Sequence, residues 1–389
     1  MNKWIHKKIG DICIVERGGS PRPIDKFITD SEDGINWIKI GDTSDSMYIT
    51  ETAQKIIPEG MKKSRYVEAG DFLLSNSMSF GRPYILKIDG CIHDGWLVLR
   101  DKDELFDKRF LYYYLSSATT YQKFKSMAVG GVVNNLNCEM IRNVYVPIPD
   151  KKEQVQIADL LDKLKSLIDS RNEELKLLDN LIKARFVEMF GDETNPYGWP
   201  IVNVQDIASV QVGVVIKPAQ YYTDAESGVR AFRSLNIGPM HIKDTDWVYF
   251  SEEGNKKNEK SILKENDLLI VRSGAPGTAC VVTKDYAGCN AIDIIIARPN
   301  MSEVNPYYLC AYTNLPHGKR QINAGTGGAA QQHFNVGKYN KLQLMLPPLD
   351  KQNEFVYFIE KVDRLKVTIQ KSLDETQVLF DSLMQKYFG

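Results

Sequence analysis

The chain has 389 residues, enough for two or three domains of ordinary size. Hydrophobic residues make up 43% and charged residues 25% of the chain, so a sizeable core is expected and wholesale disorder is excluded. The formal net charge is −1, without the positive excess typical of chains that bind nucleic acid through their overall charge. Any such contact must depend on local positive charge or on a partner.

The cysteines and the apolar stretches predict the compartment. The six cysteines form neither a Cys-x-x-Cys pair nor a Cys/His cluster with zinc spacing, so we expect reduced, mostly buried thiols and no metal site. The N-terminus lacks the apolar region of a signal peptide, and the longest nearly continuous apolar stretch, 291–297, is too short to span a bilayer. These features are typical of a cytoplasmic protein.

Short β segments bounded by turn residues are predicted for residues 1–150. Strands are expected at 71–74 and 96–99, with helix around 109–125. We interpret 1–150 as a first globular domain.

Residues 151–190 have the pattern of a long helix. Apolar residues recur at alternating spacings of three and four, the period of a coiled-coil seam, and no Gly or Pro interrupts them until Gly191. The helical run would span about 50 Å at ~1.5 Å per residue. Its seam positions are Ile157, Leu161, Leu164, Ile168, Arg171, Leu175, Leu178, Ile182, Arg185 and Met189.

Residues 191–348 and 349–389 repeat this organisation. A strand is expected at 267–271 and helix from Tyr307, followed by a second heptad run. The second seam consists of Phe355, Ile359, Val362, Lys366, Ile369, Leu373, Thr376, Phe380, Leu383 and Tyr387.

The two halves are one unit written twice. An offset of 198 residues pairs Pro149 with Pro347, Gln154 with Gln352, Asn137 with Asn335, and the Phe-Gly pair 190–191 with 388–389. Either each helix packs on its own domain, or the two helices pack on each other antiparallel and join the domains by a rigid rod of fixed length. The matching heptads favour the second interpretation.

These doubled motifs resemble the specificity subunits of type I restriction–modification systems. The motifs that carry the resemblance are 9–12, 17–21, 38–42, 70–74, 146–149 with Gln154, and 346–349 with Gln352. The resemblance implies an α+β fold with a pseudo-two-fold repeat, in which two similar α/β target-recognition domains are joined by two long antiparallel coiled-coil helices. Each domain would read one half of a split, asymmetric double-stranded DNA site. The helices would dock methyltransferase and restriction subunits, and S-adenosylmethionine, ATP and Mg²⁺ would belong to those partners, with no cofactor in this chain.

Segments that imitate catalytic motifs are incomplete. Residues 195–198 lack the second proline of a methyltransferase motif, and 325–328 lack the lysine of a P-loop. Glu174 and Lys176 flank a seam leucine rather than a metal site, and the pair His93-Asp94 alone is weak evidence for acyl transfer. We therefore predict a non-catalytic chain. The alternatives left open are a methyltransferase or nuclease with divergent motifs, and a helical scaffold that does not bind DNA.

Polar and basic residues near the Gly-rich turns could read base edges or hold phosphates. In the first copy they are Ser20, Arg22, Lys39, Asn76, Ser77, Ser79, Arg82, Asn134 and Asn135. In the second copy they are Lys217, Arg233, Arg272, Ser273, Lys319, Arg320, Gln331, Gln332 and His333. The copies differ at these positions, and two unlike readers on one scaffold would recognise an asymmetric site.

Three cations occupy seam positions, where charge is costly to bury: Arg171, Arg185 and Lys366. Either their stems pack while their heads reach water, or the heads meet acidic groups of a docked methyltransferase. We name these three residues as candidates for partner docking.

Overall fold

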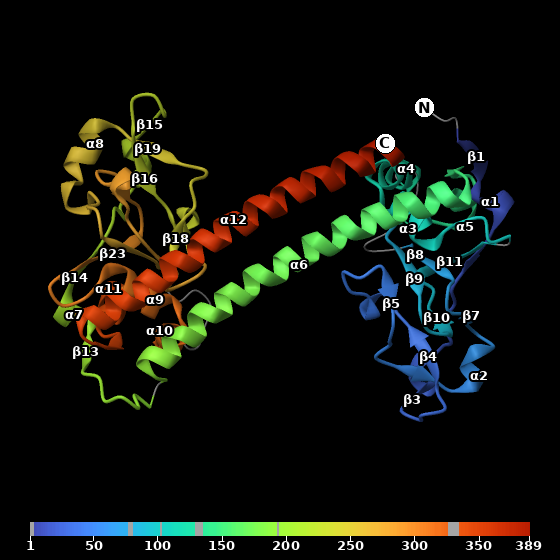
Figure 1. The fold of residues 1–389 in the computed structure, drawn as a ribbon, viewed down its shortest axis with the longest axis horizontal. Coiled ribbons are helices and arrows are strands. Elements are labelled where there is room, and N and C mark those ends of the chain that lie inside the picture. The colour runs from blue at the N-terminus through green and yellow to red at the C-terminus, as the bar shows by residue number, and fades with distance from the viewer. Residues whose placement is uncertain (1–3, 77–80, 102, 129–134, 193, 326–333) are drawn as a thin grey trace. The chain divides into compact units, whose positions relative to one another are not determined.

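The computed structural model describes residues 4–76, 81–101, 103–128, 135–192, 194–325 and 334–389. The chain forms two compact units, of which unit 1 comprises residues 1–172 and 371–389 and unit 2 comprises 173–370. Two long helices, α6 (Lys151–Phe190) and α12 (Leu349–Phe388), each pass from one unit into the other (Figure 1). The compact units are therefore not consecutive segments: each combines one globular domain with the start of one helix and the end of the other.

The described residues of unit 1 form three sheets, with strand orders β1-β12, β2-β11-β8-β9-β5 and β3-β6-β4-β10-β7. Its elements are β1 (Ile5–Lys8), α1 (Ile9–Ile12), β2 (Cys13–Arg17), η1 (Ile24–Lys26), β3 (Ile28–Thr29), β4 (Ile35–Ile38), η2 (Ile40–Asp42), β5 (Tyr48–Ile49), β6 (Lys55–Ile56), α2 (Pro58–Met61), β7 (Arg65–Val67), β8 (Phe72–Ser75), β9 (Pro83–Leu86), β10 (Gly90–Ile92), β11 (Trp96–Asp101), α3 (Lys108–Ser116), α4 (Ala118–Ala128), α5 (Cys138–Arg142) and β12 (Tyr145–Ile148).

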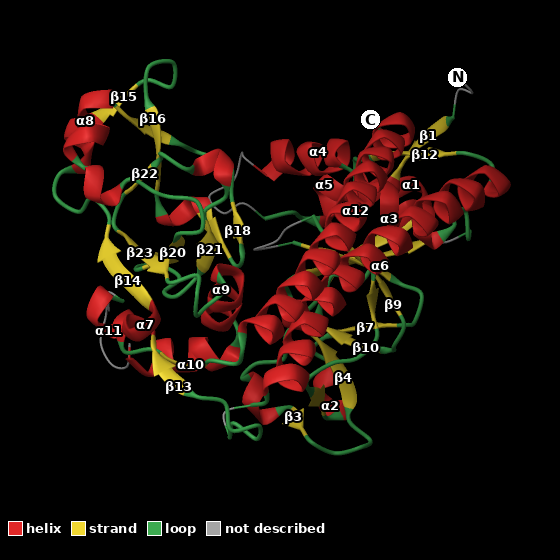
Figure 2. Cartoon of the chain, turned by 60° about the vertical axis from the view of Figure 1, so that its left-hand side comes forward, coloured by secondary structure: helices red, strands yellow, loops and turns green. Residues whose placement is uncertain are grey.

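Unit 2 repeats the same plan, with strand orders β13-β24, β14-β23-β20-β21 and β15-β19-β16-β22 and an additional hairpin, β17-β18. Its elements are β13 (Ile201–Asn203), α7 (Val204–Ile207), β14 (Ala208–Val212), η3 (Pro218–Tyr221), β15 (Tyr222–Thr223), β16 (Val229–Phe232), η4 (Ser234–Asn236), β17 (Ile237–Gly238), β18 (His241–Ile242), β19 (Val248–Phe250), α8 (Glu252–Lys257), η5 (Glu259–Ser261), β20 (Leu268–Val271), β21 (Ala279–Val281), η6 (Lys284–Tyr286), β22 (Asn290–Ala291), β23 (Ile294–Pro299), α9 (Pro306–Asn314), α10 (Pro316–Gly325), α11 (Val336–Asn340) and β24 (Gln343–Met345). Figure 2 shows the strands of each unit in yellow and the long helices in red.

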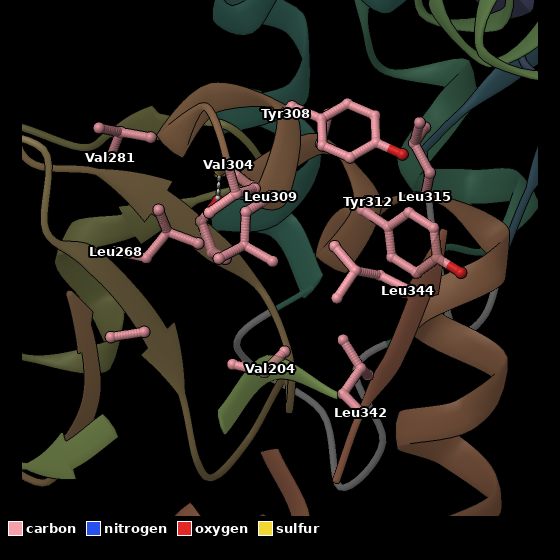
Figure 3. Close-up of a cluster of buried hydrophobic side chains, with 14 of the residues drawn as sticks. Val204, Leu268, Val281, Val304, Tyr308, Leu309, Tyr312, Leu315, Leu342 and Leu344 are labelled. Carbon is pink, nitrogen blue, oxygen red and sulfur yellow. Dashed lines mark hydrogen bonds between the residues drawn. The ribbon is translucent and has the colours of Figure 1, made fainter. Parts of the chain in front are cut away.

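The predicted strands are confirmed, and their continuous apolar character has a structural reason. In β8, Phe72 and Leu74 face a core shared with helices, whereas Leu73 faces a second core on the other side of the sheet. In β20, Leu268 and Ile270 face one core and Leu269 the other. Because both faces are covered, the strands do not alternate between apolar and polar residues. Figure 3 shows the helical side of this packing in unit 2, where Leu268 lies toward Val304 and Leu309 in one core.

The helix expected around 109–125 is two helices rather than one. The chain turns to an extended conformation at Ser117, between α3 and α4. In unit 2 the corresponding break is at Leu315, between α9 and α10. The second break has a local cause, because the proline at 316 disfavours helical geometry in the residue before it.

The heptad prediction is confirmed by burial, since every predicted seam position of α6 and α12 is buried or half-buried. Within unit 1, Phe388 at the end of α12 packs edge-on against Phe110 of α3, with 5.4 Å between ring centroids, in the same core as Ile157 at the start of α6. Within unit 2, Phe190 at the end of α6 packs in the same way against Tyr308 and Phe355. The start of one helix thus accompanies the end of the other in each unit, which makes them antiparallel.

The cysteines and the turn at 195–198 agree with the sequence-based expectations. All six cysteines are free, and all but Cys138 are buried, as expected. Burial raises the pKa of the Cys289 thiol to about 11. Residues 195–198 form a turn closed by the Gly198 N–H and the Asn195 carbonyl, as expected for a linker. Across the described residues, no helix combines the length and apolarity needed to cross a membrane.

Candidate nucleic-acid interface

In unit 1, several predicted site residues converge on one carboxylate, that of Asp94. The Ser20 hydroxyl donates to Asp94 Oδ1 at 2.7 Å, and the Arg22 guanidinium lies 3.5 Å from Oδ2. The Asn76 side-chain amide donates to the Asp94 carbonyl at 2.9 Å. We call Ser20, Arg22, Asn76, His93 and Asp94 the Asp94 cluster. It joins the loop after β2, the end of β8 and the turn before β11.

The electrostatics of the Asp94 cluster do not suit acyl transfer. The hydrogen bond from the Ser20 hydroxyl is the main cause that holds the pKa of Asp94 below its usual value, and the Arg22 guanidinium adds a weaker contribution. Burial is the main cause of a lowered pKa at His93. The two ring nitrogens of His93 face the backbone N–H groups of Ile40 and Gly95, so a neutral imidazole is favoured. Ser20 bonds to the carboxylate rather than to the histidine, so within the described residues Ser20 does not complete a Ser-His-Asp relay.

Asn76 links the Asp94 cluster to Leu136, which precedes α5. Its side chain is buried, and its Oδ1 has no hydrogen-bond partner among the described residues. The Asn76 backbone carbonyl accepts from the Leu136 N–H at 3.1 Å. The residue before Leu136 is the candidate Asn135, which is half-buried. Ser77, Ser79 and Asn134 lie outside the described residues.

Lys39 and Arg82 border the Asp94 cluster without entering it. The Lys39 ammonium donates to Gln54 at 2.7 Å, while the next residue in the chain, Ile40, donates its N–H to His93. The Arg82 guanidinium donates to the Ser44 carbonyl at 3.2 Å. Both cations are on the surface, where they could contact phosphates.

Unit 2 places an aspartate at the same point with different partners. The Asp293 carboxylate is paired with the Arg272 guanidinium. The backbone N–H of Asp293 donates to the Val214 carbonyl at 3.1 Å. The Arg272 carbonyl accepts from the Phe334 N–H at 3.1 Å, just as Asn76 accepts from Leu136 in unit 1. We call Arg272 and Asp293 the Asp293 cluster.

The remaining candidates of unit 2 have different surroundings. Lys217 is exposed, in the loop tied to Asp293 through Val214, and Ser273 directly follows Arg272. Arg233 donates to the Asp246 carbonyl. The Lys319 ammonium points into its own unit, where it donates to the Pro276 carbonyl at 3.2 Å and where burial lowers its pKa.

Arg320, which follows Lys319, is exposed. Gln331, Gln332 and His333 lie outside the described residues.

Sequence reasoning missed the two aspartates that organise these clusters. Asp94 was considered only as part of a weak His-Asp pair, and Asp293 only as an interruption in an apolar stretch. Their common position just before equivalent strands, β11 and β23, was the available signal. Among the described residues, no group of three or more His, Cys, Asp or Glu side chains could hold a metal ion.

The seam cations Arg185 and Lys366 are paired within unit 2. Arg185 donates to Glu354 of α12 at 3.1 Å and to Glu188 of its own helix at 2.8 Å. Lys366 of α12 is paired with Asp179 of α6. Neither sequence interpretation included this arrangement, in which the charges bridge the two helices. Arg171 is half-buried on α6.

Comparison with known proteins agrees with this architecture. The family model of the type I restriction modification DNA specificity domain matches residues 1–179 and again 196–376. The chain therefore belongs to this family. With two such domains, it is a non-catalytic DNA specificity subunit of a type I restriction–modification system.

Individual relatives cover nearly the whole chain. The MjaIX specificity subunit of Methanocaldococcus jannaschii is 21% identical over 98% of this chain and 92% of its own length. The EcoBI specificity subunit of Escherichia coli is 19% identical over 100% of this chain and 86% of its own. Among solved structures, the type I specificity subunit from M. genitalium covers 100% of this chain and 96% of its own, with 14% identity and a TM-score of 0.58.

Another solved chain comes from a study of complex assembly and conformational transition in a type I system. It covers 100% of this chain and 98% of its own, with 17% identity and a TM-score of 0.63. At these identities, the two solved structures support the fold and not the individual contacts.

Proposed function

We propose that unit 1 and unit 2 each read one half of an asymmetric, bipartite site in double-stranded DNA. The observation that carries the proposal is the pair of equivalent aspartates with unlike partners: Ser20, Arg22 and Asn76 around Asp94, but Arg272 at Asp293. Amide, hydroxyl and guanidinium groups differ in the base edges with which they form hydrogen bonds. One scaffold carrying two chemistries would specify two different half-sites.

The polar clusters also provide local positive charge that the net charge does not reveal. Arg22 is 80% exposed at its side chain, and Lys217 is exposed in the corresponding loop of unit 2. Each directly precedes a proline at the start of a short 3-10 helix. Two cations at matched positions suit phosphate contacts that orient each unit on the duplex.

In this proposal, methyltransferase and restriction subunits supply the chemistry, with S-adenosylmethionine, ATP and Mg²⁺ bound by those partners. The cytoplasm is the expected compartment, since cellular DNA is the substrate. For methyltransferase docking we favour the exposed apolar residues of α6 and α12 over Arg185 and Lys366, which are already paired. These residues include Leu160, Leu167, Leu177, Leu181, Tyr357 and Leu365.

A domain exchange tests the reading proposal. Residues 191–348 are replaced by the matching domain of a relative, and the methylated sites are mapped in a host that carries the methyltransferase subunit. We expect one half of the bipartite site to change and the other to remain. The isolated chain, incubated with S-adenosylmethionine and DNA, is the control and should transfer no methyl group. A change in both halves would contradict independent reading.

A further inference from the structure

The loop after β2 in unit 1 and the corresponding loop after β14 in unit 2 differ in polarity. Gly18 and Gly213 mark the same point: each donates its N–H to the equivalent strand, to the carbonyls of Trp96 and Ile294 respectively, both at 2.9 Å. A Cβ atom at Gly18 would lie 2.0 Å from the His93 carbonyl oxygen. A Cβ atom at Gly213 would lie 2.3 Å from the Ala291 carbonyl oxygen. The close approach fixes both loops at the same place on the scaffold.

Beyond this fixed point, unit 1 continues with Ser20 and the buried Pro21, whereas unit 2 has Val215 and Ile216 at these two positions. Ser20 is held by the Asp94 carboxylate. Val215 is 49% exposed and Ile216 78%, so neither contributes much to the core. The next residue, Lys217, has a φ of +44°, a left-handed conformation that lysine rarely adopts. Such strain persists where the surrounding structure holds it, and it is common at binding sites.

The base of the unit 2 loop is tied to the Asp293 cluster. The Val214 N–H donates to Ala291, and the Val214 carbonyl accepts from the Asp293 N–H. Ile216 is therefore two residues beyond Val214, which is bonded to the Asp293 backbone, and directly precedes the exposed cation Lys217 in the chain. An exposed β-branched side chain at this point borders the groups that the proposed function assigns to DNA.

We propose that Ile216 is a specificity-determining residue that contacts the C5-methyl group of a thymine in the half-site read by unit 2. An apolar side chain gains from burial only against an apolar surface. The thymine methyl is the apolar group on the base edges of the major groove, where Ala, Thr and Phe side chains are known to contact it. This inference rests on the proposed DNA reading by unit 2 and specifies one base of its half-site.

Deoxyuridine provides a direct test, because it keeps the base pairing of thymine and lacks only the methyl group. The full chain, assembled with its methyltransferase subunit, is titrated with duplexes in which each thymine of the unit 2 half-site is replaced singly. We expect one position to weaken binding about fourfold, the effect of exposing one methyl group. Ile216→Ala should weaken binding to the thymine duplex by a similar factor and bring no further loss on the deoxyuridine duplex.

Ile201→Ala is the matched control, because Ile201 is also an exposed isoleucine of unit 2, in β13. It should retain both the affinity and the deoxyuridine penalty. The inference is overturned if no thymine is sensitive, or if the penalty persists in Ile216→Ala. A loss of binding that ignores the methyl group, as expected for a wedge between base pairs, also overturns it. Absence of any site-specific binding by the wild-type complex would instead overturn the proposed function.

Discussion

Unit 1 and unit 2 agree closely where the scaffold is built and differ where DNA reading is proposed. Arg100 pairs with Asp71 in unit 1, and Arg298 pairs with Asp267 at the same place in unit 2. The Asp94 and Asp293 clusters, by contrast, share a position but not their partners. The comparison teaches that ion pairs within the scaffold are kept in both units, while side chains at loop ends can change without disturbing it.

The start of each long helix provides the strictest test of the shared scaffold. Gln154 donates to the Leu105 and Pro149 carbonyls at 3.0 Å and accepts from the Asp107 N–H at 2.8 Å. Gln352 repeats these three bonds with Glu303, Pro347 and Asn305. Both glutamines are buried. Each buried glutamine side chain thus joins a helix to its domain through three backbone groups.

We expect Gln154→Ala and Gln352→Ala to destabilise their own units by similar amounts, about 2–4 kcal/mol, because each leaves buried backbone groups unpaired. Hydrogen exchange, read separately in α3 and α9, measures the two effects. Gln156→Ala, at an exposed position of α6, should cost less than about 0.5 kcal/mol. A clearly unequal cost for the two buried glutamines would show that the two scaffolds are not energetically equivalent.

The second prediction concerns a feature that the two copies do not share. Lys366 occupies the repeat position of Ile168, a buried seam residue of unit 1. Lys366 is paired with Asp179 and lies 3.8 Å from Asp363. The side chains of Lys366 and Asp179 are 25% and 59% exposed, and a partly exposed ion pair contributes little. Replacing such a pair by an apolar residue is often neutral or stabilising.

We therefore expect Lys366→Ile to stabilise unit 2 by up to about 1 kcal/mol in chemical denaturation and to retain methyltransferase binding. Leu365→Glu, at a neighbouring residue that is 56% exposed, should leave stability nearly unchanged and abolish binding if the exposed apolar residues dock the partner. Copurification with the methyltransferase subunit separates the two. If Lys366→Ile lost methyltransferase binding and Leu365→Glu retained it, the seam cations and not the exposed apolar residues would form the docking site.

The sequence was sufficient for features that repeat or have a strict period. The 198-residue offset identified Gln154 and Gln352, and the heptads identified the seams of α6 and α12. The candidate site was only partly accessible. Ser20, Arg22 and Asn76 were found as polar loop residues, but their convergence on Asp94 was not. Ser20 and Arg22 are more than seventy positions from Asp94 in the chain, and only the fold brings them together.

Pairing of the seam cations was missed for a similar reason. A heptad pattern shows which residues face inwards, but not the register of one helix against the other. The partners of Arg185 and Lys366, Glu354 and Asp179, lie 169 and 187 residues away. Until that register is known, an isolated cation in a seam is equally compatible with exposure to water and with an external partner.

A further expected effect, which depends on pH, also belongs to unit 2 alone. His317 is 5% exposed and packs against Phe186, with 5.2 Å between ring centroids; neither ring nitrogen has a hydrogen-bond partner among the described residues. Burial is the main cause of its lowered pKa, although the nearby backbone of Asp192 and Gly191 opposes the shift. The repeat position in unit 1 is Thr119, which does not titrate.

Because the folded pKa of His317 lies below the unfolded value of about 6.5, the unfolded state binds the proton more readily as the pH falls. Unit 2 should therefore lose stability on acidification through pH 6.5, by at most about 1.4 kcal/mol at pH 5.5. His317→Phe should remove that part of the pH dependence, and His6→Asn, at an exposed histidine, should not. Hydrogen exchange of α9 at pH 7.5 and 5.5, corrected for the intrinsic rates, measures the difference. Equal acid sensitivity of the wild type and His317→Phe would show that the histidine is already protonated in the folded chain or that other groups govern this transition.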